Sequence, residues 1–199
     1  MMINFCDFDI NKFTIDNFIN NNIESKFSTI KCNYDNNHSF LLSSDFISCS
    51  WYPILRENDN SFRICKTDKL KCMFDKFKVI DDFMFGYQKN INNYKYIPFV
   101  RNSGDYFNNE QIKFKFAKNF DGSFKTKIIL GKIKNNNFEG TEQKINSMSE
   151  FKKYIKYGSK IRVIFAMNKI LLLNREPNQI KDFMLHLECV RIDIIISQK

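Results

Sequence analysis

The sequence predicts a mainly β protein of the α+β class, an antiparallel Greek-key barrel of the OB type with one longer packing helix at about 67–88 and one short helix at about 148–157. Three observations predict this fold. Most apolar runs are short and alternate with polar residues, as half-buried strands do. Helical spacing is confined to two stretches. The shorter helix stands between strands of the second half, like the helix between the third and fourth strands of an OB fold.

The chain is long enough for one domain with its own core. Its 199 residues need neither disulfides nor a structural metal, and an apolar fraction of 43% excludes a disordered tail. Ile, Asn, Lys and Phe fill 98 positions, a bias that indicates an A+T-rich genome. We therefore expect a single domain, 1–199. It is divided into an N-terminal arm at 1–25, a long Asn-rich loop at 88–110 and a basic β-rich core at 111–196.

The first half begins with the arm and continues with short strands. In 1–25, Asn and Asp surround several Phe and Ile residues, so we expect an arm or a short helix that docks by its aromatic side chains. The turn signal Asp35-Asn36-Asn37 and the dipeptide Tyr52-Pro53 divide the stretch that follows. The expected strands are Phe27–Tyr34, Ser39–Leu42, Phe46–Trp51 and Ser61–Cys65.

The clearest helix begins at Thr67, where apolar residues start to recur at spacings of three and four. Thr67 suits the N-cap, and Asp68 favours the positive end of the helix dipole. Gly86 or the Lys89-Asn90 region ends the helix. We interpret the carboxylate pair Asp81-Asp82 as part of its solvated face. The stripe expected to pack in the core is Leu70, Met73, Phe74, Phe77, Ile80, Met84 and Tyr87.

The Asn-rich connection at 88–110 is long for a compact domain, and such loops are usually functional or disordered. The Asn and Lys residues around its aromatic side chains predict that these side chains are exposed. The aromatic candidates are Tyr94, Tyr96, Tyr106 and Phe107, beside the basic candidate Arg101.

Residues 111–134 predict a basic hairpin. Two alternating runs flank Phe120-Asp121-Gly122, which suits a three-residue loop with Gly122 in the left-handed conformation. The resulting register opposes Phe116 to Thr126, Phe114 to Ile128 and Ile112 to Leu130. A two-residue turn would mix the two faces of the hairpin, so the alternation selects the first register. The outer face then carries Lys113, Lys115, Lys125 and Lys127.

Two features of charge bear on function. Like charges opposite one another destabilise a sheet, so the lysine face would gain from an external anion, unless it is a hydrated face that protects a sheet edge. The net charge of +9 lies entirely in residues 101–199, with 19 basic and 10 acidic residues. This asymmetry indicates a polyanionic partner, nucleic acid first, unless lysine is only the polar filler of an A+T-rich genome.

The remainder of the second half alternates strands with the short helix. Ser147-Met-Ser-Glu150 is a capping box that opens the helix at 148–157, and Gly158 is a natural stop. The expected strands are Lys160–Met167, Lys169–Leu173 after a tight turn at Asn168, and the long strand Phe183–Ile196.

Catalytic and metal-binding motifs are absent from the sequence. The six cysteines form no C-x-x-C pair, and His186 and Cys189 would point to opposite faces of a strand, so we expect reduced thiols and no metal site. There is no G-x-S-x-G elbow, phosphate-binding loop or dinucleotide fingerprint. We therefore expect no catalytic residue and no cofactor, although a Cys-His nucleophile is formally possible.

Targeting signals are also absent. The first dozen residues lack a basic stretch before an apolar run, and no apolar window approaches the roughly 20 residues of a bilayer span. We expect an intracellular protein without a membrane partner.

Three stretches of 112–196 carry a resemblance to a family. They are the basic hairpin, the run Gly158-Ser-Lys-Ile-Arg-Val-Ile-Phe-Ala-Met-Asn-Lys-Ile and the final strand. Together they resemble an uncharacterised family of large eukaryotic DNA viruses, related to OB-type single-stranded DNA-binding proteins. The resemblance implies the host cytoplasm or the virion as the location. An aromatic residue tends to follow the Asn168-type turn in that family, whereas Ile170 and Leu171 stand here, so a stacking residue is absent at this place.

These observations favour sequence-independent binding of single-stranded DNA or other nucleic acid, in viral replication or packaging. Such proteins combine a basic groove for the phosphates with aromatic side chains that stack on bases. The alternative is a structural protein of virion assembly without catalytic activity. The candidate protein partners are further copies of this chain, in a homo-oligomer, or other viral proteins. An enzyme ranks last. The candidate binding residues are Lys113, Lys115, Lys125, Lys127, Phe120, Arg162, Arg101, Tyr94, Tyr96 and Tyr106.

Overall fold

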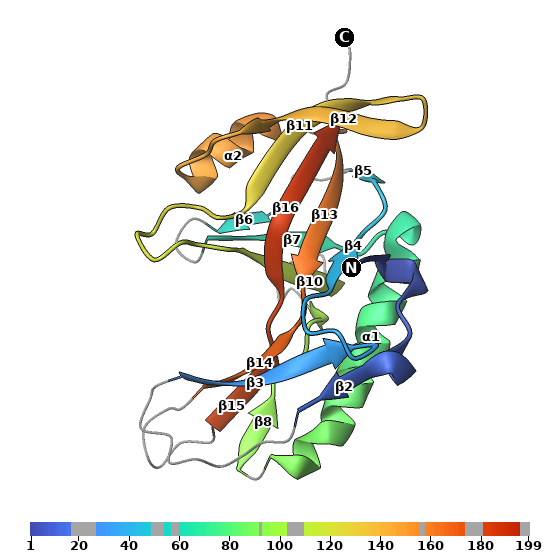
Figure 1. Cartoon of the computed structure of the whole chain (residues 1–199), viewed down its shortest axis with the longest axis vertical. Helices are drawn as coiled ribbons and strands as arrows, with labels where there is room; N and C mark the ends of the chain where they lie inside the picture. The colour runs from blue at the N-terminus through green and yellow to red at the C-terminus, as the bar shows by residue number, and fades with distance from the viewer. Residues whose placement is uncertain are drawn as a thin grey trace.

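The protein consists mainly of β strands, in two sheets, with one long helix (Figure 1). The computed structural model describes residues 1–16, 27–48, 54–56, 60–91, 93–102, 110–155, 158–173 and 181–195. The larger sheet contains β1 (Met2–Asn4), β4 (Leu41–Ser43), β5 (Ile47–Ser48), β6 (Ile54–Arg56), β7 (Ser61–Cys65), β9 (Arg101–Asn102), β10 (Glu110–Phe116), β11 (Lys127–Lys134), β12 (Asn137–Gln143), β13 (Lys160–Ala166) and β16 (Glu188–Ile195). The smaller sheet contains β2 (Phe13–Ile15), β3 (Phe27–Tyr34), β8 (Tyr94–Tyr96), β14 (Lys169–Leu173) and β15 (Lys181–Leu185).

The prediction of a mainly β, barrel-like α+β fold is confirmed, since one of the two sheets curls into a half-barrel. The main path through the larger sheet runs β1-β4-β13-β16-β10-β7-β6, and the smaller sheet runs β2-β3-β14-β15-β8. Several expected strands appear with nearly the expected bounds, among them β3, β7 and β14.

Helix α1 (Lys71–Tyr87) packs beside both sheets, as Figure 1 shows. The helix continues a 3-10 turn at Asp68–Leu70 and is followed by another at Gln88–Asn90, so the predicted extent is confirmed. Thr67 occupies the N-cap of the first turn, although its side chain makes no capping hydrogen bond. The predicted stripe is buried from Leu70 to Met84.

Aromatic side chains of the first and second halves meet at Phe77 of α1. Its ring centroid lies 4.5 Å from that of Phe5, 5.2 Å from Phe99 and 5.9 Å from Phe165. These rings come from the N-terminal segment, the segment after β8 and strand β13. The helix therefore joins distant parts of the chain through one buried aromatic cluster, each pair of which adds about 1 kcal/mol beyond its burial.

The N-terminal segment contributes strands to both sheets. Strand β1 pairs in parallel with β4, and β2 pairs antiparallel with β3. Between them lie two 3-10 turns, Phe5–Asp7 and Ile10–Lys12. Phe5, Phe8 and Phe13 are buried, so the segment is held by its aromatic side chains.

The predicted hairpin of 111–134 is wrong over most of its length. Strands β10 and β11 do not pair with each other; both run parallel to β16, along successive parts of its edge. Lys118 and Phe124 still form an isolated antiparallel bridge in the predicted register. Strand β11 instead pairs antiparallel with β12, through a turn at Asn135 and Asn136. Strand β16, which lies far away in the sequence, is thus their common partner, and β10 and β11 follow one another along its edge.

The C-terminal strand and the tight turn at Asn168 are also corrected. Strand β13 of the larger sheet is followed by β14 of the smaller sheet, and the two do not pair with each other. Strand β15 pairs antiparallel with β14, and β16 pairs antiparallel with β13. His186 N donates to Lys169 O at 2.8 Å between the two sheets. We call this arrangement the two-sheet hairpin. The expected strand Phe183–Ile196 is therefore broken at His186-Leu187.

Helix α2 (Met148–Tyr154) confirms the capping box. Glu150 N donates to Ser147 Oγ at 3.2 Å, and the Glu150 carboxylate accepts from Asn146 N at 2.6 Å. The helix ends three residues before the predicted boundary because Ile155 adopts an extended conformation.

Candidate nucleic-acid interface

A loop of ten residues, 117–126, leaves the edge of the larger sheet between β10 and β11. We call it the tip loop. At its base Ala117 N donates to Thr126 Oγ1 at 2.8 Å, and Thr126 Oγ1 donates to Cys189 O at 2.6 Å. The buried threonine thus closes the loop and fixes both of its ends to β16. The loop extends away from the sheet at the left of Figure 1.

Local hydrogen bonds shape the end of the tip loop. Asn119 N donates to Ser123 O at 2.8 Å, and Ser123 N donates to the Asp121 carboxylate at 2.9 Å. The Ser123 hydroxyl and amide together hold the pKa of Asp121 below its ordinary value. Gly122 adopts a φ of 84°, the left-handed conformation that the sequence predicted for it.

Phe120 stands at the end of this loop and is fully exposed, with a relative solvent exposure of 110%. Lys118 and Lys125 are exposed on the same loop, and Lys118 Nζ lies 5.2 Å from the centroid of the Phe124 ring. The loop thus presents one aromatic side chain among cations. This is the combination that stacks on a base while neutralising phosphates.

The strand that leads into the tip loop carries a second group of cations. Lys113, Lys115 and Arg101 line one pocket of about 200 Å³, which we call the basic pocket. Arg101 lies on β9, directly opposite Gln111 of β10, and Lys113 lies opposite Arg63 of β7. Three predicted binding residues are therefore brought together, and Lys115 lies only two positions before the loop.

The basic pocket also contains His186, which joins the two sheets. Burial, together with the charges of Lys169 and Lys115, lowers the pKa of His186 to about 4, and Glu188 opposes this effect. The imidazole is consequently neutral at pH 7. Glu188 is also the acidic neighbour of Lys115 across the strands, and its carboxylate lies 3.4 Å from Lys169 Nζ.

Arg63 adds a further positive charge beside this pocket, next to the buried amide of Gln111. Arg63 Nη1 donates to Gln111 Oε1 at 3.1 Å, but the buried Arg63 Nε and Gln111 Nε2 have no acceptor among the described residues. Burial and the neighbouring Arg63 lower the pKa of Arg101. Arg63 and Arg101 thus lie close enough for their positive charges to repel each other.

Two predicted cations are engaged elsewhere. Lys127 forms an exposed ion pair with Glu142 at 3.0 Å. Arg162 donates two hydrogen bonds to the fully buried Asp193, at 2.9 and 2.6 Å, and its guanidinium lies 4.8 Å from the Phe46 ring centroid. The side chain of Arg162 therefore neutralises a buried carboxylate and stabilises the sheet.

The loop tyrosines divide into three cases. The expected exposure of Tyr96 is wrong: only 1% of it is exposed, and its hydroxyl donates to Asp81 at 2.7 Å. Tyr94 is half-buried, with Lys181 Nζ 5.6 Å from its ring centroid. Tyr106 lies outside the described residues, as does Phe107.

Asp81 corrects a second interpretation, since this carboxylate is buried and not on the solvated face of α1. Besides Tyr96, it accepts hydrogen bonds from Phe99 N at 2.8 Å and Val100 N at 3.1 Å. Burial raises the pKa of Asp81 despite these donors. The bonds fix the segment that leads to Arg101, so Asp81 positions one wall of the basic pocket.

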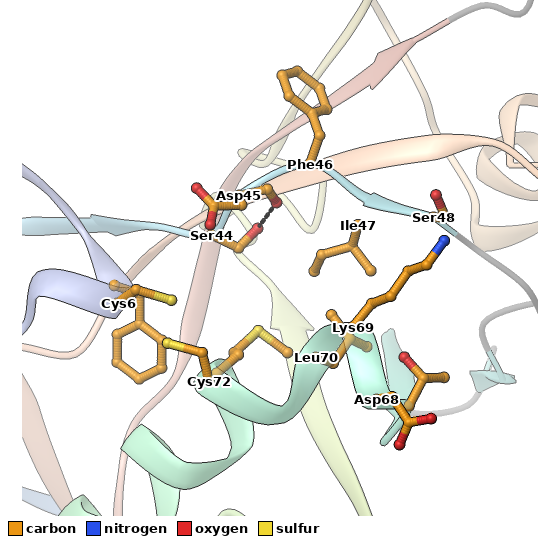
Figure 2. A pocket seen from close by; sticks show the side chains of 13 residues that line it. Cys6, Ser44, Asp45, Phe46, Ile47, Ser48, Asp68, Lys69, Leu70 and Cys72 are labelled. Carbon is orange, nitrogen blue, oxygen red and sulfur yellow. Dashed lines mark hydrogen bonds between the residues drawn. The ribbon is translucent and has the colours of Figure 1, made fainter.

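A larger pocket of about 380 Å³ lies between the N-terminal segment, residues 44–48 and the start of α1 (Figure 2). Ser44 Oγ donates to Asp45 O at 2.8 Å on its wall. Burial and a hydrogen bond with Cys72 raise the pKa of Cys6 to about 12, so this thiol is protonated at pH 7. The pocket contains Asp45 and Asp68 but one lysine, Lys69, and is a poor site for a polyanion.

The sequence indicated several site residues and missed others. It indicated Phe120 and the lysines of β10 through their alternation around a turn. It missed His186, which the break between β15 and β16 brings into the pocket, and Arg63, which the register with β10 places beside it. The described residues hold no cluster of three or more His, Cys, Asp or Glu side chains suited to a metal ion.

Comparisons with known proteins add no relatives. No protein-family model matches the chain, and no curated protein matches it significantly. None of the helices in the described part of the chain combines the length and apolar character that crossing a bilayer requires.

Proposed function

We propose that the protein binds single-stranded nucleic acid without sequence preference. The observation that carries the proposal is the fully exposed Phe120, held among exposed lysines on a loop with a fixed base. Every base offers a flat π face to an exposed aromatic ring, so stacking on this ring does not depend on sequence.

In the proposed interface, Phe120 stacks on one base while the cations bind the phosphates. Lys118 and Lys125 lie on the loop itself, and Lys115 lies on the strand that enters it. Contacts of this kind release counterions, so the affinity falls as salt rises. The A+T-rich composition and the resemblance to a viral family support a role in viral replication or packaging.

The first test compares Phe120→Ala with the wild type in fluorescence anisotropy of labelled oligo-dT, at roughly 50 and 200 mM salt. Loss of one stacked base should weaken binding by about 1–3 kcal/mol, which is roughly five- to 150-fold. The salt dependence should stay close to that of the wild type, because the substitution removes no charge.

Phe85→Ala is the matched control, since Phe85 of α1 is the other exposed phenylalanine among the described residues, at 51%. This variant should bind like the wild type. If the wild-type protein does not bind oligo-dT at the lower salt concentration, the proposal is refuted. Phe120 would then be assigned to contact with a protein partner, as in an assembly component.

A further inference from the structure

The basic pocket has two chemically different sides. One side carries Arg101, Lys113, Lys115 and His186, and the other is apolar. The apolar lining consists of Ile97, Pro98, Phe99, Leu171, Met184 and Leu187. An anionic group attached to a largely apolar or planar body matches this division.

The size of the pocket limits what can occupy it. Its volume of about 200 Å³ is below the roughly 300–1,000 Å³ of pockets that enclose drug-sized ligands. One sugar-phosphate unit fits this space, whereas the interior of a strand would have to enter and leave it. The dimensions therefore favour the end of a chain.

The charges favour a terminal phosphate over an internal one. A terminal phosphomonoester carries about −1.5 to −2 charges at pH 7, while each internal phosphodiester carries one. Arg101 and Lys115 line the pocket, with Arg63 and Lys169 beside them. Glu188 and Asp81 are acidic neighbours. The nearby Arg63 Nε and Gln111 Nε2 also lack acceptors among the described residues. A dianion compensates this potential better than a monoanion does.

We propose that the basic pocket binds the phosphorylated end of a nucleic-acid strand whose adjacent base stacks on or near the tip loop. This inference rests on the proposed function and adds end recognition to it. Arg101 and Lys115 contact the phosphate oxygens, and the neutral His186 donates one hydrogen bond. The strand then leaves along β10 towards Phe120.

The test measures competition by three unlabelled oligo-dT strands of equal length, ending in a 5′-phosphate, a 3′-phosphate or only hydroxyls. One phosphorylated strand should compete roughly tenfold or more better than the hydroxyl-ended strand, the effect expected of a hydrogen-bonded charged group. Thymidine 5′-monophosphate and inorganic phosphate are added as separate competitors. Both should compete far less well than the phosphorylated strand, because they lack the remaining contacts.

The variant Arg101→Gln/Lys115→Gln removes two exposed cations and should reduce the preference for phosphorylated strands to about twofold or less. Lys69→Gln/Lys71→Gln removes two exposed cations at the start of α1 and should retain the wild-type preference. Circular dichroism and thermal unfolding establish that both variants fold.

The outcomes separate the two proposals. Equal competition by phosphorylated and hydroxyl-ended strands overturns end recognition and leaves strand binding intact. Thymidine monophosphate that competes as well as the phosphorylated strand also overturns it, because the ligand is then a free nucleotide. No binding of any strand overturns both proposals.

Discussion

The carboxylate of Asp81 is the residue that holds the segment before Arg101 against helix α1. Its two oxygens accept three hydrogen bonds, from Tyr96 Oη, Phe99 N and Val100 N. A buried charge is costly unless such donors surround it. The same tyrosine that the loop composition predicted to be exposed is therefore one of the supports of the core.

Tyr96→Phe should lower the free energy of unfolding by about 1–2 kcal/mol, because it leaves the buried Asp81 carboxylate with one donor fewer. Urea unfolding followed by circular dichroism measures this change. Tyr154→Phe is the matched control: Tyr154 is half-buried on α2, and no hydrogen bond of its hydroxyl is seen among the described residues. A Tyr96 variant as stable as the control would contradict the supporting role.

His186 makes stability depend on pH in a defined window. Its pKa in the folded protein is about 4, against 6.5 for an ordinary histidine, so the unfolded chain binds the proton more tightly between these values. The free energy of unfolding is therefore highest above pH 6.5, and it falls as the pH falls towards 4. Going from pH 7 to 5 should cost about 2 kcal/mol from this group.

Urea unfolding at several pH values tests this dependence with the two histidines of the chain. His186→Gln should flatten the dependence between pH 5 and 7, while His38→Gln, at an exposed position, should leave it steep. Equal slopes in the wild type and in His186→Gln would show that the dependence has another source.

At the scale of elements, the hairpin of β11 and β12 depends on two glycines that face each other. Gly131 pairs with Gly140, and a Cβ on Gly131 would overlap the carbonyl oxygen of Glu139. The overlap is with backbone, which cannot rotate away as a side chain can. The close approach of the two strands therefore requires glycine at this pair.

Gly131→Ala should destabilise the protein by about 1–3 kcal/mol, the usual cost of overpacking, as the two strands must separate. Gly86→Ala is the opposite case, because a Cβ at that helical position meets nothing within 4 Å. It should stabilise the protein by about 0.5–1 kcal/mol. Thermal unfolding of both variants measures these changes in stability. A Gly131→Ala variant as stable as the wild type would contradict the requirement for glycine at this pair.

Elements with local signals could be predicted from the sequence, and those defined by distant partners could not. The stripe of α1, the capping box of α2 and the alternation of β3 are local patterns, and all three appear. The predicted pairing of β10 with β11 was wrong because both strands pair with β16, which lies far away in the sequence. The break between β15 and β16 was not predicted, because the residues of 181–195 are apolar on nearly both faces and give no signal where the chain passes from one sheet to the other.

The candidate site follows the same division. Phe120 and Gly122 could be placed from the turn signal alone, since a loop end depends on its own residues. The predicted exposure of Tyr96 was wrong because its hydroxyl binds Asp81, fifteen positions earlier on another element. The pocket around Lys113 could not be predicted, because it depends on the register of β10 with β7 and β9, and the sequence of one strand does not contain that register.

At the scale of the whole molecule, positive charge is brought together from both halves of the chain. The excess of basic residues lies in 101–199, yet Arg63 of the electrically neutral first half lies beside the pocket, on β7. Arg162, in contrast, is used to neutralise Asp193 within the sheet. The net charge counts every basic residue of the chain, while the fold decides which of them are exposed and which neutralise a buried carboxylate.

The two-sheet hairpin has a consequence for the order in which the protein can fold during synthesis. Its strands lie at the centre of both sheets, yet they are the last strands to be made. Strands β1, β4 and β3 must wait for β13 and β14, and β10 and β11 must wait for β16. Such distant pairing makes folding slow and leaves apolar edges exposed meanwhile. Until residues 160–195 have left the ribosome, neither sheet has its centre.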